Sequence, residues 1–392
     1  MVKKVYLDHA ATTYTDQEVL KEMLPFFSDL YGNPSSLHSY GREVKRHIDI
    51  ARNKVAKAIG ALPDEIFFTA GGSESDNWAI KGIAYANANK GKHIITTKTE
   101  HHAALYTCES LEKEGFNVTY LPVDKYGMIN IEELKSAISD DTILISIMYA
   151  NNEIGTIQPI EEISRIAKEN KIYFHTDAVQ AIGNIKIDVK EQNIDLLSLS
   201  AHKFYGPKGI GALYIRKGIR IKNLIYGGGQ EKGKRAGTEN VPGIVGLGKA
   251  IEKAAENIDK YNNKIAKLRN KLIEGVMERI PYTILTGHPE RRLAGNASFC
   301  FKYIEGEALL LNLDLKGIAG SSGSACTSGS LDPSHVLLAI GLPHEIAHGS
   351  LRLTIGNINT EEDIDYVLEV LPGIVEKLRQ MSPLYDDVKG GN

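Results

Sequence analysis

One lysine stands where a covalent cofactor could be held. Lys203 lies in SLSAHKFYGPKG, just after an apolar, strand-like run at 196–200, and a glycine–proline break follows it. A lysine beyond the end of a buried strand reaches into a cleft at the edge of a sheet, where loss of water lowers an amine pKa and favours Schiff-base formation. Alone, such a lysine is more often a surface residue, so Lys203 needs partners before it indicates chemistry.

Two polar residues after another strand supply partners for this lysine. Asp177 and Gln180 lie in HTDAVQA, directly after the apolar run at 172–176. A carboxylate at that position keeps the pyridine nitrogen of pyridoxal 5'-phosphate (PLP) protonated, and an amide can donate to the phenolate oxygen of the ring. Asp177 could also cap a helix, but the two roles are compatible. Together with Lys203, these residues favour a PLP enzyme.

A third segment has the form of a phosphate site. In TAGGSESDN, residues 69–77, a strand is followed by two glycines and then by a helix that begins near Ser73. The N-terminus of such a helix presents backbone N–H groups and a hydroxyl to an anion. A plain capped helix is the alternative for this segment taken by itself.

Two further strand ends carry groups suited to the same site. His101, in KTEHHAAL, follows the strand-like run at 93–97, and its imidazole could stack on the cofactor ring and move protons near neutral pH. Asn152, in YANNEIGT, follows the run at 142–149 and could hydrogen-bond the cofactor or the substrate. Asn151 is an equal rival by spacing, whereas His102 is better explained as exposed to solvent.

These motifs fall on a repeating pattern of strands and helices. Continuous apolar strands separated by amphipathic helices indicate a mostly parallel sheet covered on both faces, with ligands bound beyond the carboxyl ends of the strands. We expect strands at 65–69, 93–97, 118–122, 142–149, 172–176, 196–200 and 211–215, and helices at 74–86, 103–114, 131–138 and 159–170.

A second, smaller unit follows this region. A glycine-rich hinge at 227–240 precedes a long helical stretch at 241–278, and then come a strand at 297–301, a helix at 306–311 and a closing helix at 361–381. We therefore expect an α/β protein with an N-terminal arm (1–14) that packs with the small domain, a large cofactor-binding domain (15–258) and a small C-terminal α/β domain (259–392).

Composition sets limits on the partners and the compartment. The 392 residues carry a net charge of −3, from 46 basic and 49 acidic side chains, so nothing calls for a nucleic-acid or membrane partner. No apolar run approaches the roughly 18 residues of a membrane span, and the N-terminus lacks the apolar region of a secretory signal. Three cysteines, without metal-site spacing, do not make a disulfide framework. We expect a cytoplasmic protein without an intrinsic metal.

Taken together, the motifs resemble the cysteine desulfurases of the NifS/IscS type, which are fold-type I PLP enzymes of aminotransferase class V. The resemblance covers nearly the whole chain, from LDHAATT and YGNPSSLH near the start to LRLTIG near the end. The pairing of SAHKFYGPKG with SSGSACTS is its most specific part. It implies a large domain with a mostly parallel seven-stranded sheet and a smaller C-terminal α/β domain.

The resemblance also implies a role for each matching residue. Lys203 holds PLP and acts as catalytic base, with Asp177 on the pyridine nitrogen, Gln180 on the phenolate oxygen and His101 stacked on the ring. The substrate is bound by Asn152, which also contacts the cofactor, and by Arg352, which clamps the α-carboxylate. The phosphate is held by Gly72, Ser73, Ser200 and His202, and by Thr238 from the neighbouring subunit of a homodimer. Where the family usually has Ala-Thr, this chain has Gly72-Ser73, which keeps the hydroxyl.

Cys326 is implied as the residue that accepts the sulfur of L-cysteine as a persulfide and leaves L-alanine. Its small polar neighbours in SSGSACTS are poor core material, whereas Cys108 and Cys300 lie in helix and strand patterns that favour burial. The sulfur would pass to an iron–sulfur scaffold protein (IscU-like) or another acceptor, including tRNA thiolation. Cys326 would also transiently ligate a [2Fe–2S] cluster shared with that scaffold.

Three other functions are weighed against this one. A selenocysteine lyase or another class-V enzyme shares most of the motifs, although the SSGSACTS loop argues against a simple aminotransferase. A nucleotide-binding protein is disfavoured because GPKGIG and GGGQEKGKR match neither G-x-x-x-x-G-K-[ST] nor G-x-G-x-x-G. A sulfur-relay protein that has lost catalysis is disfavoured by the presence of Lys203, Asp177 and Cys326.

Overall fold

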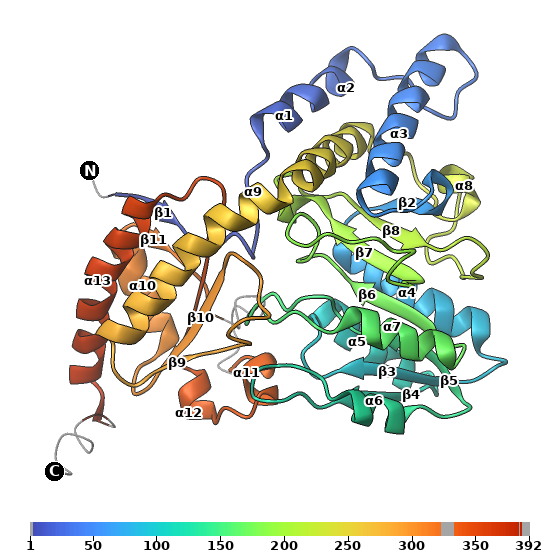
Figure 1. Ribbon diagram of the computed structural model, residues 1–392. Coiled ribbons are helices and arrows are strands. Elements are labelled where there is room, and N and C mark those ends of the chain that lie inside the picture. The colour runs from blue at the N-terminus through green and yellow to red at the C-terminus, as the bar shows by residue number, and fades with distance from the viewer. Residues whose placement is uncertain (1–2, 323–332, 384, 386–392) are drawn as a thin grey trace.

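A seven-stranded sheet forms the centre of the larger part of the molecule. The computed structural model describes residues 3–322, 333–383 and 385 (Figure 1). The sheet has the order β2-β8-β7-β6-β5-β3-β4, and every strand except β8 runs in the same direction. Its strands are β2 (Ile66–Thr69), β3 (His93–Thr97), β4 (Asn117–Leu121), β5 (Thr142–Ser146), β6 (Tyr173–Asp177), β7 (Leu196–Ser200) and β8 (Gly211–Ile215). The mostly parallel seven-stranded sheet predicted from the sequence is confirmed.

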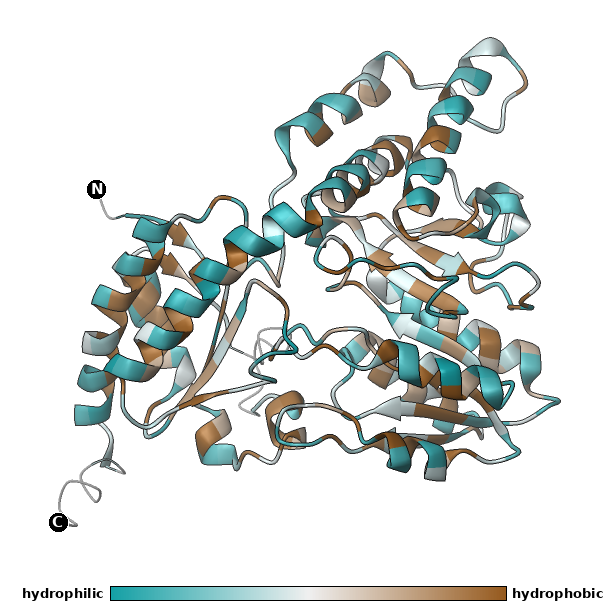
Figure 2. Cartoon of the chain, in the orientation of Figure 1, coloured by the Kyte–Doolittle hydropathy of each residue, from teal (hydrophilic) through white to brown (hydrophobic). Residues whose placement is uncertain are grey.

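Neighbouring residues of a strand enter two different cores, because side chains alternate between the faces of a sheet. Ile94 and Leu196 pack with α4 (Gly72–Asn87) and α5 (His102–Glu112) on one face, whereas Ile95 and Leu197 join the core on the other face. The core on that other face is completed by α3 (Ser39–Ala58), α6 (Ile131–Ala137), α7 (Ile160–Glu169) and the first part of α9 (Val241–Arg279). The strands are apolar on both faces for this reason, and Figure 2 shows the helices turning their hydrophilic sides to solvent.

The four helices predicted between strands, now α4, α5, α6 and α7, agree with the observed helices to within one or two residues at each end. The helix α3 was not predicted. The helices of this part are α1 (Gln17–Met23), α2 (Pro25–Ser28), α3 (Ser39–Ala58), α4 (Gly72–Asn87), α5 (His102–Glu112), α6 (Ile131–Ala137), α7 (Ile160–Glu169) and α8 (Gln230–Gly233), with the 3₁₀ turns η1 (Pro63–Glu65) and η2 (Ala201–Lys203).

A separate core, here called the small core, surrounds the far half of a 39-residue helix, α9 (Val241–Arg279). This helix crosses from one part of the molecule to the other (Figure 1). Around it lie two small sheets, β12-β10-β9 and β1-β11. The elements are β1 (Val5–Tyr6), β9 (Thr283–Leu285), β10 (Asn296–Phe301), α10 (Gly306–Leu315), β11 (Ile318–Ala319), α11 (His335–Ala339), α12 (His344–Ala347), β12 (Ser350–Thr354) and α13 (Glu361–Gln380).

The N-terminal arm joins the small core and then crosses to the large sheet. Val5 and Leu7 are buried in the small core, and β1 pairs with β11. The following residues run back toward the large sheet, where Thr13 N–H donates to the carbonyl of His202. Within residues 3–322, 333–383 and 385, no helix combines the length and the apolar composition that a membrane crossing requires.

Candidate active site

Polar residues gather where the parallel strands end. Asp177 is the last residue of β6, and Ser200 is the last residue of β7, immediately before the turn η2 that carries Lys203. His101 is the N-cap residue of α5, and α4 begins at Gly72, just after β2. Since these strands run in the same direction, their carboxyl ends meet at one edge of the sheet.

The amine of Lys203 points to the N-terminal arm. Its Nζ donates to the carbonyl oxygens of Ala10, at 2.6 Å, and Ala11, at 2.8 Å. The side-chain amide of Gln180 donates to the same Ala10 carbonyl at 3.0 Å. Lys203 and Gln180 therefore converge on one point, although 193 and 170 residues separate them from Ala10.

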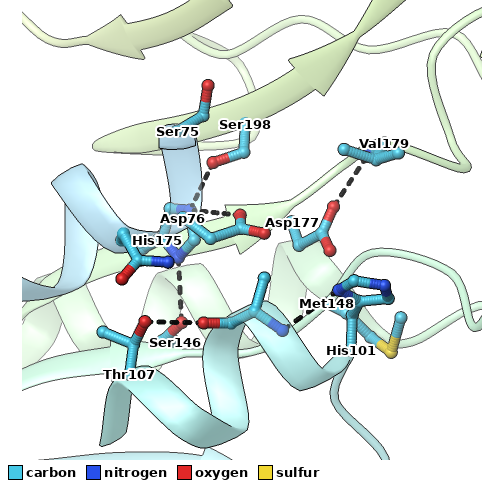
Figure 3. Close-up of polar contacts among 12 residues, drawn as sticks. Ser75, Asp76, His101, Thr107, Ser146, Met148, His175, Asp177, Val179 and Ser198 are labelled. Carbon is cyan, nitrogen blue, oxygen red and sulfur yellow. Dashed lines mark hydrogen bonds and ion pairs between the residues drawn. The ribbon is translucent and has the colours of Figure 1, made fainter. Parts of the chain in front are cut away.

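Asp177 is a buried carboxylate close to this lysine. Its Oδ1 accepts a hydrogen bond from the backbone N–H of Val179 at 2.9 Å (Figure 3). Burial raises the pKa of Asp177 to about 6, while that hydrogen bond and the positive charge of Lys203 act in the opposite direction. A carboxyl whose pKa is raised by burial and lowered by a nearby positive charge can pair with a protonated ring nitrogen, because that nitrogen would add a second positive charge beside it.

His101 lies near the same lysine as a neutral imidazole. Burial, and then the charge of Lys203, lower its pKa to about 4. Its Nδ1 accepts from the N–H of Ala103 at 3.1 Å, which fixes the ring at the start of α5. With the proton on Nε2, this histidine can stack on a ring or donate a hydrogen bond, but it carries no charge at neutral pH.

The start of α4 forms a small cradle at the end of β7. Gly71 has a φ of 155°, and a Cβ at this position would have only the Ser200 hydroxyl within 4 Å among the described residues. Ser73 and His101 both line a cavity of about 460 Å³ beside it. A helix N-terminus with a nearby hydroxyl and open space can hold a phosphate group.

His202, expected to hold the phosphate, is bound to the N-terminal arm. Its Nδ1 lies 3.1 Å from the hydroxyl of Thr12, and burial and the charge of Lys203 lower its pKa to about 4. It is therefore a neutral hydrogen-bonding group next to Lys203.

Arg352 is a buried guanidinium held between two distant segments. On β12 and only 5% exposed, it donates from Nη1 to the carbonyl of Asn152 and from Nη2 to the carboxylate of Asp8, both at 3.0 Å. Its Nε has no hydrogen-bond partner within the part of the chain that the structure describes. A buried donor without a partner is costly, so this edge of the guanidinium is suited to a carboxylate from outside the chain.

The structure distinguishes the two neighbouring asparagines. The amide of Asn151 is buried, donates to the Thr99 carbonyl and accepts from the N–H groups of Glu153 and Ile154, so it shapes the loop. The side chain of Asn152 makes no hydrogen bond to another described residue, and its backbone carbonyl meets Arg352. This geometry favours Asn152 over Asn151 as the ligand-binding residue.

One predicted site residue, Thr238, is not brought to Lys203 in the single chain. It lines a separate cavity with Thr69 and Ala70. Cys326 lies outside the described residues. The other two cysteines are buried as expected, and burial raises the pKa of both the Cys108 and the Cys300 thiols, the latter to about 12.

Three residues of the site were not identified from the sequence. Asp8, in LDHAATT, pairs with Arg352, while Asp76 and His175 form a buried contact beside Asp177. A partial signal was present for His175, because it precedes Asp177 by two residues on β6 and so shares its side of the strand. Nothing local in the sequence pairs Asp8 with a residue 344 positions away.

Comparison with known proteins identifies the family of this chain. The aminotransferase class-V family model matches residues 5–367. A cysteine desulfurase IscS of Clostridium botulinum strain Hall is 65% identical over 389 residues, covering 99% of this chain and 98% of the relative. The cysteine desulfurase IscS of Methanosarcina thermophila is 64% identical, with 97% and 94% coverage.

Solved structures give the same result at lower identity. A NifS-like protein superposes with a TM-score of 0.90 at 44% identity, covering 96% of this chain and all of that one. A structure described as SspA in complex with cysteine has a TM-score of 0.78 at 38% identity, covering 91% of this chain and all of the other. The chain therefore belongs to the aminotransferase class-V family, within which it is a PLP-dependent cysteine desulfurase.

Proposed function

We propose that this protein removes sulfur from L-cysteine with Lys203 as the PLP-binding lysine, Arg352 as the carboxylate clamp and Cys326 as the sulfur acceptor. The observation that carries the proposal is the meeting of Lys203, the buried Asp177 and the neutral His101 at one sheet edge. The relative described as bound to cysteine supports this amino acid as the substrate.

The residues at this edge fit PLP by their chemistry. Lys203 supplies a primary amine, Asp177 a buried carboxylate for the ring nitrogen and Gln180 an amide donor for the ring oxygen. The turn at Gly71, with Ser200 beside it, leaves room that a side chain at that glycine would narrow. The phosphate would be held by Gly72, Ser73, Ser200 and His202, with Thr238 of a second subunit.

When bound, PLP stabilises negative charge at the substrate's Cα, and this chain's residues do the rest. Arg352, through the Nε edge that has no partner among the described residues, and Asn152 hold the α-carboxylate and so orient the Cα–H bond. Lys203, once released from the cofactor, takes the Cα proton. His101 is neutral and lies near Lys203, so its imidazole could pass protons to or from the reacting atoms.

Cys326 then receives the sulfur. Its thiolate attacks the substrate's sulfur, a sulfur–sulfur bond forms and the carbon–sulfur bond breaks, so that a thiol and L-cysteine become a persulfide and L-alanine without an external oxidant or reductant. The persulfide would pass to an IscU-like iron–sulfur scaffold, with transient [2Fe–2S] ligation by Cys326, or to tRNA thiolation.

We also propose that the working unit is a homodimer. Phe27, Tyr31, Leu37 and Tyr40 are more than half exposed and lie together on the α2–α3 segment, which a second copy would cover. The division into an arm (1–14), a large domain (15–258) and a small domain (259–392) is supported by α9, which places 241–251 in one core and 265–276 in the other.

Two variants test the proposed chemistry. Purified protein should show the visible absorption of a PLP imine, which Lys203→Ala should abolish and Lys208→Ala, five residues on, should retain. Cys326→Ser should keep the absorption but stop sulfide release from L-cysteine in the presence of reductant, whereas Cys108→Ala, in the core, should keep both. An unchanged absorption in Lys203→Ala, or normal sulfide release by Cys326→Ser, would refute the corresponding assignment.

A further inference from the structure

A second carboxyl lies fully buried beside Asp177. Asp76, the fifth residue of α4, is 1% exposed, and its Oδ1 is 3.7 Å from Nε2 of His175, which is itself completely buried. His175 is held by Ser146 on one side, at 2.8 Å from Nδ1, and by Ser198 on the other, at 3.0 Å from Nε2. Figure 3 shows Asp76, His175 and Ser198 beside Asp177.

Burial, Asp177 and Glu100 all raise the pKa of Asp76, and only a hydrogen bond from the Ser198 hydroxyl lowers it. Asp76 faces Asp177 and His175 from β6, Ser198 from β7 and Glu100 from the segment after β3. His175 is neutral, because burial lowers its pKa to about 3. Asp76 Oδ1 accepts no hydrogen bond from any residue that the structure describes, although an ionised oxygen in the interior requires donors.

Asp177 is the better carrier of charge in this pair. It accepts the N–H of Val179 and lies near Lys203, whereas Asp76 has neither contact. Burial and the proximity of Asp177 both raise the pKa of Asp76 well above its usual range. Two adjacent buried carboxyls do not readily ionise together, so one of them retains a proton.

We propose that Asp76 is a positioning residue that keeps this proton, so that the single negative charge of the Asp76–Asp177 pair lies on Asp177 and faces the cofactor's ring nitrogen. His175, fixed by Ser146 and Ser198, is the neutral partner that holds Asp76 in place. The inference rests on the cofactor placement proposed above.

The position of Asp76 gives this contact a second consequence. One turn before it, Gly72 and Ser73 begin α4 at the proposed phosphate cradle, while Asp177 ends β6 at the proposed ring site. The contact between Asp76 and the β6–β7 side chains therefore sets the spacing between the two ends of the cofactor. Losing its hydrogen-bonding capacity should weaken cofactor binding even if no charge changes.

Infrared spectroscopy of the PLP-loaded protein tests the protonation of Asp76 directly. The difference between wild type and Asp76→Asn at neutral pH should contain the C=O stretch of a carboxylic acid, which moves on exchange into D₂O. Glu100 is a second buried acid whose pKa is raised to about 8, so Glu100→Gln should lose a band of its own and leave the Asp76 difference unchanged. Loss of a carboxylate band in Asp76→Asn would overturn the proposal.

Cofactor affinity tests the positioning role without measuring turnover. Asp76→Asn keeps the shape and the neutrality of a protonated aspartic acid, so its Kd for PLP should stay within about threefold of wild type. Asp76→Ala should weaken PLP by about tenfold or more, because His175 and Ser198 lose their partner. Equal weakening in both variants would also overturn the proposal. Failure of wild type to bind PLP would instead refute the proposed function.

Discussion

At the scale of single residues, the candidate site depends on charges that burial controls. The histidines around Lys203 are neutral, and Asp177 is poised between burial and a nearby positive charge. Arg352 differs from them, because its charge is already paired with Asp8 while one edge keeps a donor without a partner in the described chain. That donor leads to a prediction about substrate binding.

Arg352→Lys should raise KM for L-cysteine and lower kcat/KM by about 10- to 100-fold. The reason is that a lysine ammonium cannot replace the planar guanidinium, which contacts Asp8, Asn152 and the substrate carboxylate at the same time. Steady-state kinetics of sulfide release would measure both parameters. Arg379→Lys is the matched control: Arg379 is equally buried but donates to the carbonyls of Lys302 and Tyr282, far from Lys203. An unchanged KM in Arg352→Lys would argue against the clamp.

At the scale of elements, the packing of α9 on α3 depends on a small residue. A Cβ on Gly248 of α9 would lie 2.7 Å from both Cα and Cβ of Ala51 on α3, so the two helix backbones approach each other closely there. Gly373 of α13 differs, since a Cβ there would meet nothing within 4 Å. The same substitution should therefore have opposite effects in the two helices.

Gly248→Ala should lower the free energy of unfolding by about 1–3 kcal/mol, because the extra methyl group forces the helices apart. Gly373→Ala should raise it by roughly 0.5–1 kcal/mol, because alanine costs less backbone entropy than glycine in a helix. Urea unfolding followed by circular dichroism would give both values. If Gly248→Ala proved as stable as wild type, α3 and α9 would not be in such close contact.

At the scale of the whole molecule, one residue proposed for the phosphate site does not reach that site within a single chain. Thr238 lies away from Lys203 in its own chain, and the α2–α3 segment exposes Tyr31 and Leu37, at 69% and 91%. A second copy could cover the exposed segment and bring its own Thr238 to the site. If a second copy covers this segment, one charged side chain placed on the segment should weaken the dimer.

Leu37→Asp should raise the dimer dissociation constant by at least about tenfold, because a charge would then be buried without a partner at the interface. Analytical ultracentrifugation would show wild type at twice the 43.0 kDa chain mass and the variant shifting toward one chain. Leu315→Asp makes the same change at another exposed leucine, on α10 in the other part of the molecule. This control variant should remain dimeric. Monomeric wild type would contradict the proposed homodimer.

The sequence by itself determined the strands and the residues that follow them. Strands have a period of two and end in recognisable turns, so the positions of Lys203 and His101 after β7 and β3, and of Asp177 at the end of β6, could be predicted from neighbouring residues alone. The cysteine pattern was equally local, because Cys108 and Cys300 fall at apolar positions that the fold buries.

Only the tertiary structure decided which distant groups meet and which of them are charged. The contacts of Arg352 with Asp8, and of Asp76 with His175, join segments that no local pattern relates. Their protonation depends on how completely packing removes water and on which opposite charges lie nearby, and both are properties of the assembled core. The choice of Asn152 over Asn151 is of the same kind, since it depends on which amide the loop itself has already used.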